Sequence, residues 1–379
     1  MTRNLSQWLD YQSGLHPAVM DFGLGRMHEM LNRLGLRRGA ERVITVGGTN
    51  GKGSVTSTLA ALAQAAGLRV GLYQSPHLER YEERIRIDGE DIDEASLCAV
   101  FERIESVRGD LPLTYFEFGT LAALVAFAER KLDVWVLEVG LGGRLDAVNA
   151  WDPDCAVVVS ISLDHVDYLG ADLEGIGREK AGIFRAGVPA ILGSEHMPRS
   201  LALHAQAIGA RLYVLGRDFS SHRHARGHDY RGLRVSLEDL PTPRLAGNAQ
   251  YGNTATALMA LESLGLLPSR EAVVRGLGSV RLTGRYQVLP GPVEWVFDVA
   301  HNEGSAAVLV QTLIERRSAG RTLFVAGMLK DKDAATVARI LKPAVGATDA
   351  VVAVTLPGDR GRTGVELAAV WSPLLGTDV

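Results

Sequence analysis

A glycine-rich segment with one lysine, GTNGKGS at residues 48–54, contains the residue types that bind phosphate. It directly follows the apolar run 43–46 and precedes a Ser/Thr/Ala-rich stretch of helical character. In a strand–loop–helix arrangement, backbone N–H groups and the helix N-terminus can surround phosphate oxygens. Lys52 would reach the outer phosphates, and the Ser54 hydroxyl could face a magnesium ion. The segment predicts nucleotide binding; a plain strand-to-helix turn is the alternative, because Gly53 stands where the common P-loop pattern has serine or threonine.

Three further polar residues follow or end predicted strands: Ser75, Glu138 and His165. Ligands of open parallel sheets bind at the carboxyl ends of the strands, so these side chains are expected near the glycine-rich loop. A hydroxyl, a carboxylate and an imidazole there could hold Mg²⁺ together with phosphate oxygens and waters. Each residue alone also has an ordinary structural explanation: a helix cap, a salt-bridged strand end and a hydrogen-bonded turn histidine. Their combination with the phosphate loop favours the metal site.

Two more positions carry groups that could act on a substrate. Lys180 lies on a short predicted helix, 178–183, where a lysine is usually a solvated charge. The segment DVAHN at 298–302 supplies a carboxylate and the imidazole of His301 at a strand end, which again indicates a site. The histidines of the polar stretch 220–230 have no other ligand-like neighbours, so a solvated surface loop is expected there rather than a metal site.

The composition limits the class of protein. The chain has 379 residues, 46% apolar and 22% charged, which predicts two or three domains with large cores. A net charge of −4 gives no general attraction to nucleic acid or to an anionic membrane. The N-terminus does not resemble a signal peptide, and no run of ~18 apolar residues could span a membrane. Cys98 and Cys155 stand in apolar surroundings and are expected to be core residues, so a cytoplasmic protein is predicted.

Strands and helices alternate along the chain, which predicts an α/β fold: a P-loop-type, mostly parallel sheet with helices on both faces. The strands are expected at 43–46, 69–74, 133–139, 155–162 and 189–193, and the helices at 93–108, 116–130, 178–183 and 247–264. A second pattern from residue 293 predicts a smaller, Rossmann-like α/β domain. Its strands are expected at 293–299, 323–328 and 350–355, and its helices at 303–317 and 334–341. The predicted domains are 1–282 and 283–379, with 280–286 as linker.

Several motifs together resemble the Mur ligase superfamily, in particular the bacterial bifunctional dihydrofolate synthase/folylpolyglutamate synthase family. The matching segments are LHPAVMDFGLGR (15–26), GTNGKGS (48–54), SPHLERYEERI (75–85), TYFEFGT (114–120), LEVGLGGRLDAVN (137–149), SISLDHVDYLG (160–170), GREKAGIFR (177–185), FDVAHN (297–302) and GMLKDKD (327–333). The resemblance implies an ATP-dependent ligase. A pteroate or folate carboxylate would attack the ATP γ-phosphate to give an acyl phosphate, and the amino group of L-glutamate would then displace phosphate.

The resemblance also implies roles for individual residues. Those expected to contact ATP are Thr49, Asn50, Gly51, Lys52, Gly53, Ser54, Asn253, Arg285 and Asp298. Those expected to bind the pteroate are Asp21, Phe22, Gly23, Leu24, Thr114, Tyr115, Phe116, Glu117, Leu145, Asp146 and Ala147. Those expected to ligate magnesium, with two ions implied, are Ser75, Glu138 and His165. The residues expected to take part in catalysis are Lys52, Lys180 and His301. Lys180 matches a position that the family carbamylates with CO₂, which reverses the interpretation of this residue as a solvated charge.

The chain departs from the family in two places. Residues 247–250 read GNAQ where the family often has His-Gln, although Asn253 remains. The family's usual final strand and glycine-serine-phenylalanine-type segment are missing before Val379, so either this copy is short or the sequence is truncated. The alternatives are a monofunctional folylpolyglutamate synthase, against which the segment 22–26 argues, and a nucleotide-binding switch or scaffold without ligase activity. The expected partners are dihydropteroate, reduced folates, L-glutamate and ATP, bound by a monomer, with no nucleic acid and no membrane.

Overall fold

The computed structural model describes residues 3–18, 21–164, 166–316 and 320–379. The chain falls into two compact units. Unit 1 comprises Met1–Ile161, Val166–Arg244 and Tyr251–Leu282. Unit 2 comprises Ser162–His165, Leu245–Gln250 and Thr283–Val379. The short segments at 162 and 245 thus belong to unit 2 although their neighbours in the sequence belong to unit 1.

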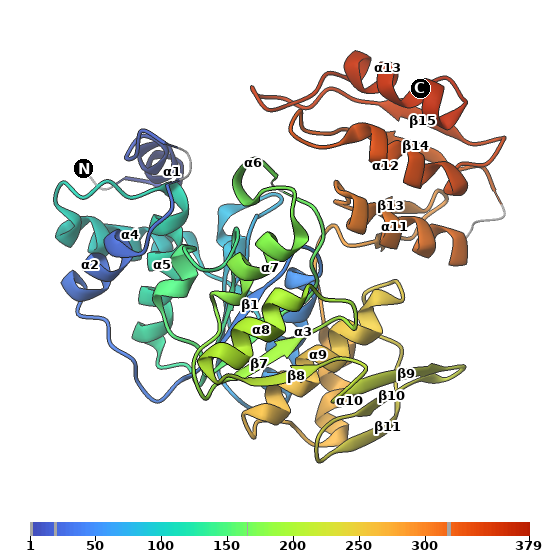
Figure 1. Ribbon diagram of the computed structural model, residues 1–379. Helices are drawn as coiled ribbons and strands as arrows, with labels where there is room; N and C mark the ends of the chain where they lie inside the picture. Colours follow the sequence, from blue (N-terminus) through green and yellow to red (C-terminus); the bar gives the residue numbers. More distant parts are fainter. Residues whose placement is uncertain (1–2, 19–20, 165, 317–319) are drawn as a thin grey trace. The chain divides into compact units, whose positions relative to one another are not determined.

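Unit 1 is built on a sheet that has eight strands within the described residues, in the order β4-β3-β2-β5-β1-β6-β7-β8 (Figure 1). The strands are β1 (Arg42–Gly47), β2 (Val70–Tyr73), β3 (Ile85–Ile87), β4 (Glu90–Asp91), β5 (Val134–Glu138), β6 (Cys155–Val158), β7 (Pro189–Leu192) and β8 (Arg211–Val214). From β2 to β8 every neighbouring pair is parallel, and β3 and β4 form an antiparallel edge. The predicted mostly parallel sheet is confirmed.

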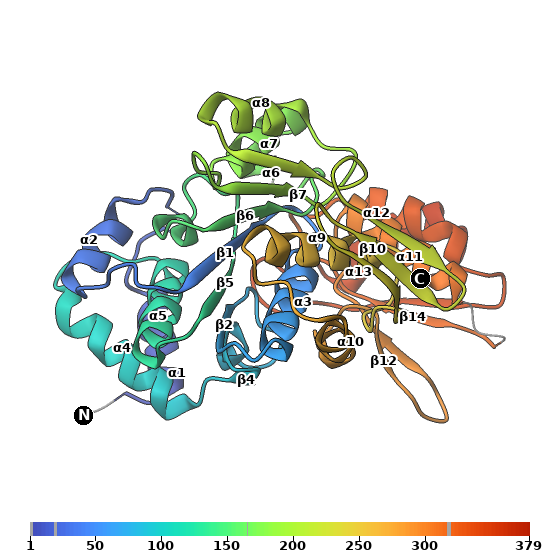
Figure 2. The same ribbon diagram turned by 90° about the horizontal axis from the view of Figure 1, so that it is seen from below.

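Helices cover both faces of this sheet. On one side lie α1 (Leu5–Ser13), α2 (Gly25–Arg33), α4 (Glu94–Arg108) and α5 (Tyr115–Arg130), and on the other lie α3 (Lys52–Ala65), α9 (Ala249–Ser263) and α10 (Arg270–Ser279) (Figure 2). The strand β5 is apolar from Val134 to Leu137 because both of its faces are covered. Trp135 and Leu137 pack in the first core, whereas Val134 and Val136 pack in the second. Successive strand residues point to opposite faces, so a strand covered on both faces needs an unbroken apolar run.

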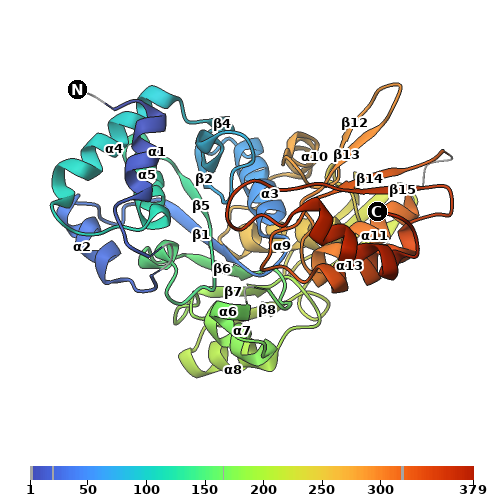
Figure 3. The same ribbon diagram turned by 90° about the horizontal axis from the view of Figure 1, so that it is seen from above.

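Two helices lie between β6 and β7 in the sequence, α6 (Val166–Leu169) and α7 (Leu173–Ala181), and α8 (Arg199–Ile208) follows β7 (Figure 3). The helix expected at 178–183 is therefore longer and begins earlier. It begins after Asp172, whose carboxylate accepts hydrogen bonds from the N–H groups of Glu174 and Gly175. An aspartate at this N-cap position fixes where a helix starts.

The prediction of a surface loop at 220–230 is wrong. This stretch contributes β9 (Ser220–His224) and β10 (Gly227–Arg231) to an antiparallel sheet with β11 (Ser236–Leu240). Tyr230 and Leu240 pack into the same core as α9, which explains why a polar-looking segment forms strands. The histidines do not converge: His222 is exposed, whereas His228 is buried against the ring of Tyr251, 5.2 Å between centroids.

Unit 2 is the smaller α/β unit that the sequence predicts. It contains an antiparallel pair, β12 (Gln287–Leu289) with β13 (Trp295–Phe297), and a parallel pair, β14 (Leu323–Ala326) with β15 (Ala350–Ala353). Its helices are α11 (Glu303–Glu315), α12 (Ala334–Leu341) and α13 (Gly364–Leu375). The helices pack together in a core that includes Val337, Leu367 and Trp371.

Two smaller expectations have mixed outcomes. Cys155 is a buried core residue, as predicted, but Cys98 is half-buried on α4, because it lies beside the core rather than in it. Both thiols are free. Among the described residues no helix is long and apolar enough to cross a membrane.

Candidate active site

The glycine-rich loop connects β1 to α3 in unit 1. Gly51 precedes the first residue of α3 and has φ +85°, a left-handed conformation that glycine adopts without strain. A Cβ on Gly51 would lie 2.9 Å from Val159 Cγ1 and 3.2 Å from Asn253 Oδ1. The loop therefore requires glycine at this position for its backbone angle and for its space. The same distances place the amide of Asn253, a residue of α9, against the loop.

The residues that follow β6 hold the loop in place. Thr49 N–H donates to Ser160 O at 2.7 Å, and Asn50 N–H donates to Ser160 Oγ at 3.1 Å. The Ser160 hydroxyl donates in turn to Asn50 O at 2.9 Å. The sequence analysis expects Thr49 and Asn50 to contact the nucleotide, but their backbone N–H groups already donate to Ser160. The N–H groups of the first turn of α3, including that of Gly53, have no partner within the helix and are better placed to meet a phosphate.

Two lysines converge on one carbonyl group of the loop. Lys52 Nζ donates to Gly48 O at 3.1 Å and to Thr49 O at 3.2 Å. Lys180 Nζ, from the last turn of α7, donates to the same Gly48 O at 2.9 Å. The Lys180 residue is only 4% exposed. The sequence-based description of Lys180 as a solvated charge is therefore wrong, because this ammonium is buried beside the phosphate loop.

Glu138 ends β5 and is buried, with 4% of the residue exposed. A Cβ on Gly53 would lie 3.8 Å from Glu138 Oε2, so this carboxylate faces the first turn of α3. Because β2 pairs with β5 in parallel, Ser75, two residues after β2, follows the same sheet edge as Glu138. The third expected metal ligand, His165, lies outside the described residues. Within the described residues no group of three His, Cys, Asp or Glu side chains is placed to hold a metal.

The segments expected to bind pteroate meet through an arginine. Thr114 is the N-cap of α5, and its N–H donates to Glu117 Oε2 at 2.8 Å in a capping box. Arg26 Nε donates to both oxygens of Glu117, at 3.0 and 3.1 Å. Arg26 Nη1 donates to Asp21 Oδ2 at 2.7 Å. Asp21 and the start of α5 thus come together, but Thr114 and Glu117 are buried and hydrogen-bonded within the protein.

Aromatic side chains in the same region keep exposed or half-buried surface. Phe22 is 41% exposed, and its ring lies 5.9 Å from that of Tyr168, which is 53% exposed. Phe116 is half-buried and lies over Gly140, where a Cβ would come within 2.5 Å of the ring. Phe116 and Phe22 are therefore able to offer a flat apolar surface to a ring system.

The loop 140–147 lies between the two groups of residues. Asp146 is buried, and burial raises the pKa of its carboxyl to about 6, although hydrogen bonds from Leu141 N and Val148 N oppose the shift. The positive charge of Lys52 opposes it as well, which indicates that Asp146 is near the phosphate loop. A Cβ on Gly143 would lie 3.0 Å from the Cα of Lys180. The predicted pteroate residues Leu145 and Ala147 flank Asp146, half-buried and buried respectively.

Unit 2 carries the remaining predicted residues. Asp298 follows β13; Tyr286 N and Ala300 N each donate to its carboxylate at 2.8 Å. Burial raises the pKa of the Asp298 carboxyl, and these donors together with the charge of Arg285 oppose that shift. His301 Nδ1 lies 2.8 Å from Val299 O. The segment 298–302 is therefore a fixed turn, with Arg285, Asp298 and His301 close together.

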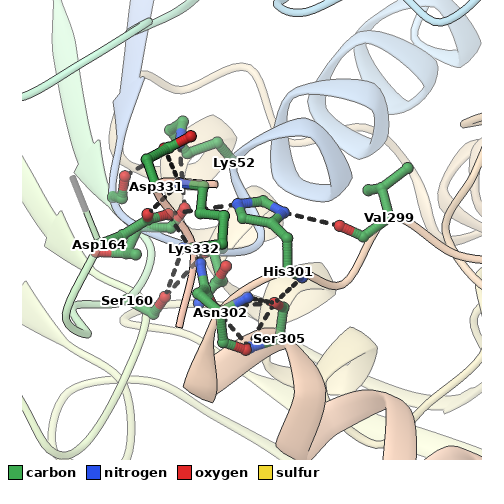
Figure 4. A network of polar contacts seen from close by, with 12 residues as sticks. Lys52, Ser160, Asp164, Val299, His301, Asn302, Ser305, Asp331 and Lys332 are labelled. Atoms are coloured by element: carbon green, nitrogen blue, oxygen red, sulfur yellow. Dashed lines mark hydrogen bonds and ion pairs between the residues drawn. The ribbon is translucent and has the colours of Figure 1, made fainter. Parts of the chain in front are cut away.

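A network that the sequence does not predict surrounds His301 (Figure 4). Asp164 Oδ1 lies 2.6 Å from Lys332 Nζ, and Asp164 Oδ2 accepts a hydrogen bond from Asn302 Nδ2 at 2.8 Å. Asp164 Oδ2 also lies 3.4 Å from His301 Nε2. The side chains of Asp164 and Lys332 are 10% and 8% exposed. All four residues belong to unit 2, because the segment Ser162–His165 clusters with that unit.

The sequence analysis assigns no role to four residues at these sites: Gln74, Arg26, Asp164 and Lys332. Gln74 is an example of a residue whose role depends on its contacts. Its side chain donates to Gly53 O at 3.1 Å, to Thr56 Oγ1 at 2.7 Å and to Ser57 Oγ at 3.1 Å, which fixes the first turn of α3. A polar residue at the end of the predicted strand 69–74 was the signal available for Gln74, much as the position after that strand selected Ser75.

Comparison with known proteins agrees with this arrangement. Residues 46–218 match the Mur ligase middle domain, and residues 284–377 match the Mur ligase, glutamate ligase domain. The dihydrofolate synthase/folylpolyglutamate synthase of Escherichia coli (strain K12) is 46% identical over 363 residues, which cover 96% of this chain and 84% of the relative. The folylpolyglutamate synthase of Lacticaseibacillus casei is 33% identical and covers 88% of this chain and 81% of its own length.

Solved structures with the same fold contain ligands. E. coli FolC in complex with DHPP and ADP has a TM-score of 0.93 and 44% identity, covering 99% of this chain and 88% of that one. A bifunctional folylpolyglutamate synthase/dihydrofolate synthase with Mn, AMPPNP and L-glutamate bound has a TM-score of 0.90 and 44% identity, covering 97% and 88%. The fold, the order of the motifs and the identity over almost the whole length lead to one conclusion: this chain belongs to the Mur ligase family, in its dihydrofolate synthase/folylpolyglutamate synthase branch.

Proposed function

We propose that this protein is an ATP-dependent ligase that joins L-glutamate to dihydropteroate and to reduced folates through an acyl-phosphate intermediate. The observation that carries the proposal is the set of residues around the glycine-rich loop in unit 1. Lys52, Lys180, Glu138 and Asn253 all lie against a loop whose Gly51 cannot be replaced without a clash. A phosphate loop that also carries a buried carboxylate suits transfer of a phosphoryl group better than simple nucleotide binding.

The proposed reaction assigns a task to each unit. Unit 1 binds the triphosphate at the loop 48–54, and Asn253 orients the nucleotide from α9. Unit 2 supplies Arg285 and Asp298 as further nucleotide contacts and is the proposed glutamate-ligase unit. The substrate carboxylate attacks the γ-phosphate and ADP leaves. The amine of glutamate then attacks the acyl carbon, phosphate leaves, and the nitrogen loses a proton.

Magnesium is the proposed metal, and the residues present fit it. Glu138 is a buried carboxylate that faces the first turn of α3, with its Oε2 3.8 Å from the position that a Cβ on Gly53 would take. Ser75 follows the same sheet edge, and hard oxygen ligands suit Mg²⁺. A bound divalent cation would neutralise negative charge on the phosphates during transfer. His165 remains a proposed third ligand, and a second ion remains part of the proposal.

Carbamylation of Lys180 is also proposed. The neutral amine would add to CO₂ and release a proton, which converts a cationic side chain into an anionic one. Support comes from the position of Lys180: its Nζ is buried and lies 2.9 Å from Gly48 O of the phosphate loop. A carbamate there would stand close enough to the loop to help hold a metal ion.

The pteroate is proposed to bind between α5, the loop 140–147 and the segment Asp21–Leu24. Phe116 and Phe22 offer the apolar surface, while Asp146 provides a buried carboxyl group for a polar ring edge. Of the residues expected to bind the pteroate, Thr114 and Glu117 shape this site through the capping box. Tyr115, Gly23, Leu145 and Ala147 complete the list of proposed contacts.

The decisive experiment measures ADP release with dihydropteroate or tetrahydrofolate as the acceptor, with and without L-glutamate. The proposal expects turnover with both acceptors, glutamate-dependent formation of the amide product, and a mass increase of one glutamyl residue. Turnover with tetrahydrofolate alone would instead favour a monofunctional folylpolyglutamate synthase. ATP hydrolysis that ignores both acceptors would contradict the ligase assignment. The expectations of a monomer and of a cytoplasmic location stay predictions.

A further inference from the structure

The carboxylate of Asp164 has the most demanding surroundings of any acidic side chain near His301. It is 10% exposed and meets the ammonium of Lys332, the amide of Asn302 and the imidazole of His301, at 2.6, 2.8 and 3.4 Å (Figure 4). All three partners present nitrogen atoms to two carboxylate oxygens. A buried carboxylate with cationic and amide donors is held rigidly, because the loss of any partner leaves charge uncompensated.

The partners of Asp164 are themselves fixed by the backbone. Asn302 is the N-cap of α11: its Oδ1 accepts from Ser305 N at 2.9 Å while its Nδ2 donates to Asp164. Lys332 lies just before α12, whose N-cap is Asp333. Asp164 therefore connects the starts of two helices of unit 2. Any shift of its carboxylate would have to move one of them.

The orientation of His301 follows from the same contacts. A carbonyl oxygen only accepts hydrogen bonds, so Nδ1, at 2.8 Å from Val299 O, carries a proton. Nε2 lies 3.4 Å from the oxygen of Asp164, and this contact is an ion pair only when Nε2 carries a proton as well. In that doubly protonated form, the ring is held on one side by the backbone and on the other by Asp164. The backbone contact alone would leave the ring free to rotate about the Nδ1 hydrogen bond.

We propose that Asp164 is a positioning residue for the ligase reaction: clamped by Lys332 and Asn302, it fixes the imidazole of His301. The inference rests on the proposed function, in which His301 acts on the substrates. It assigns Lys332 a defined task as well, that of balancing the charge of Asp164.

The first test compares steady-state rates of product formation for wild type, Asp164→Asn and Lys332→Met. Asparagine has nearly the shape of aspartate, but its NH₂ group would face one of the nitrogen donors. We expect kcat to fall about 100-fold in both variants with little change in KM for ATP, since misplacement by about 1 Å costs that much. Lys330→Met is the matched control: this lysine lies in the same segment, is exposed, and its side chain donates to Asp359 O at 3.1 Å. Its rate should stay within about twofold of wild type.

A second test separates positioning from a general loss of structure. If Asp164 acts through His301, Asp164→Asn should lower kcat in the wild-type background but have little further effect in a His301→Asn background. Multiplied losses would overturn the inference, as would an Asp164→Asn enzyme with wild-type kcat. Circular dichroism checks that each variant is folded. If Asp164→Asn does not fold, the same cycle is run with Lys332→Met.

A third measurement does not depend on turnover. The imidazole signals of His301, assigned with His301→Asn, are recorded by NMR in wild type and in Asp164→Asn. We expect the His301 resonances to shift and broaden in the variant; identical resonances would refute the positioning role. This measurement tests the positioning role of Asp164 separately from the proposed ligase function. A wild-type enzyme that forms no glutamylated product would defeat the proposed function, whereas the NMR comparison would still decide whether Asp164 holds His301.

Discussion

Replacing Arg26 with alanine should uncouple the segment Asp21–Leu24 from the rest of unit 1. The guanidinium makes two hydrogen bonds to Glu117, at 3.0 and 3.1 Å, and one to Asp21 Oδ2 at 2.7 Å. The Glu117 side chain is 4% exposed, whereas that of Asp21 is 43% exposed. The bond to Asp21 therefore contributes about 0.5 kcal/mol, and the bonds to buried Glu117 contribute most of the stabilisation.

The magnitude follows from the burial of the pair. Removing one partner of a fully buried ion pair costs about 3–5 kcal/mol. Arg26 keeps a fifth of its side chain exposed, and Glu117 retains the N–H of Thr114, so water and this bond recover part of the loss. We expect Arg26→Ala to lower the free energy of unfolding by about 2–3 kcal/mol. Urea denaturation of unit 1 measures this change.

The functional consequence should be selective. Asp21 belongs to the proposed pteroate site, so kcat/KM for dihydropteroate should fall about tenfold to 100-fold, while the affinity for ATP should hardly change. Arg103→Ala is the matched control, because Arg103 and Glu129 form an ion pair in which both side chains are at least 40% exposed. Adding Glu117→Gln to Arg26→Ala should restore part of the stability, since the uncompensated charge is removed. An Arg26→Ala protein with wild-type stability and dihydropteroate kinetics would refute the reasoning.

Three further changes test other parts of the site. Gly51→Ala should weaken ATP binding at least tenfold, as measured by calorimetry. The left-handed backbone costs a residue with a Cβ about 1–2 kcal/mol, and the new Cβ would meet Val159. Gly187→Ala is the control: Gly187 has φ +71° but open space around it, so this variant should lose stability without losing ATP binding. The contribution of Asp146 to stability should fall by about 2 kcal/mol as the pH rises from 4 to 6. Burial raises the pKa of Asp146 to about 6, so the folded state binds the extra proton below that pH and loses it above. Asp146→Asn should flatten this part of the urea-denaturation profile. Lys180→Arg should be inactive if a carbamate is required, and full turnover in the ADP-release assay would contradict the carbamate.

The strands and helices around the phosphate loop were predictable because their signals are local. The apolar run at 43–46, the glycines and the single lysine predict a strand, a turn and a helix start, and the structure has all three. The stretch 220–230 was not predictable in this way. Its strands are stabilised by Tyr230, which contacts Met259 and Glu262 of α9, and by pairing with the neighbouring strand β11. Such contacts between distant residues leave no local pattern.

The positions of the candidate site residues were predictable only in part. Glu138 and Ser75 were found because parallel strands end at a common edge. Asp164 and Lys332 were not, because their pairing joins residues 168 positions apart and neither residue shows its partner in the sequence. Lys180 was misjudged from its helix for the same reason. Lys180 is buried because it packs against Gly48, and the spacing of residues along its helix gives no information about that contact.

The convergence of two lysines on Gly48 O has a physical reason. A carbonyl oxygen carries partial negative charge, so near a phosphate it would repel the ligand unless a donor held it. Lys52 and Lys180 both donate to this oxygen, at 3.1 and 2.9 Å, and thereby offset its charge at the point where β1 leads into the loop. The loop can therefore present N–H groups to an anion while this acceptor is already occupied. A carbamate on Lys180 would keep one N–H on Nζ but would replace the positive charge of the ammonium with a negative one, so Lys52 would remain as the positively charged donor to this carbonyl. The loop thus keeps one lysine for its own structure even if the other is modified for the reaction.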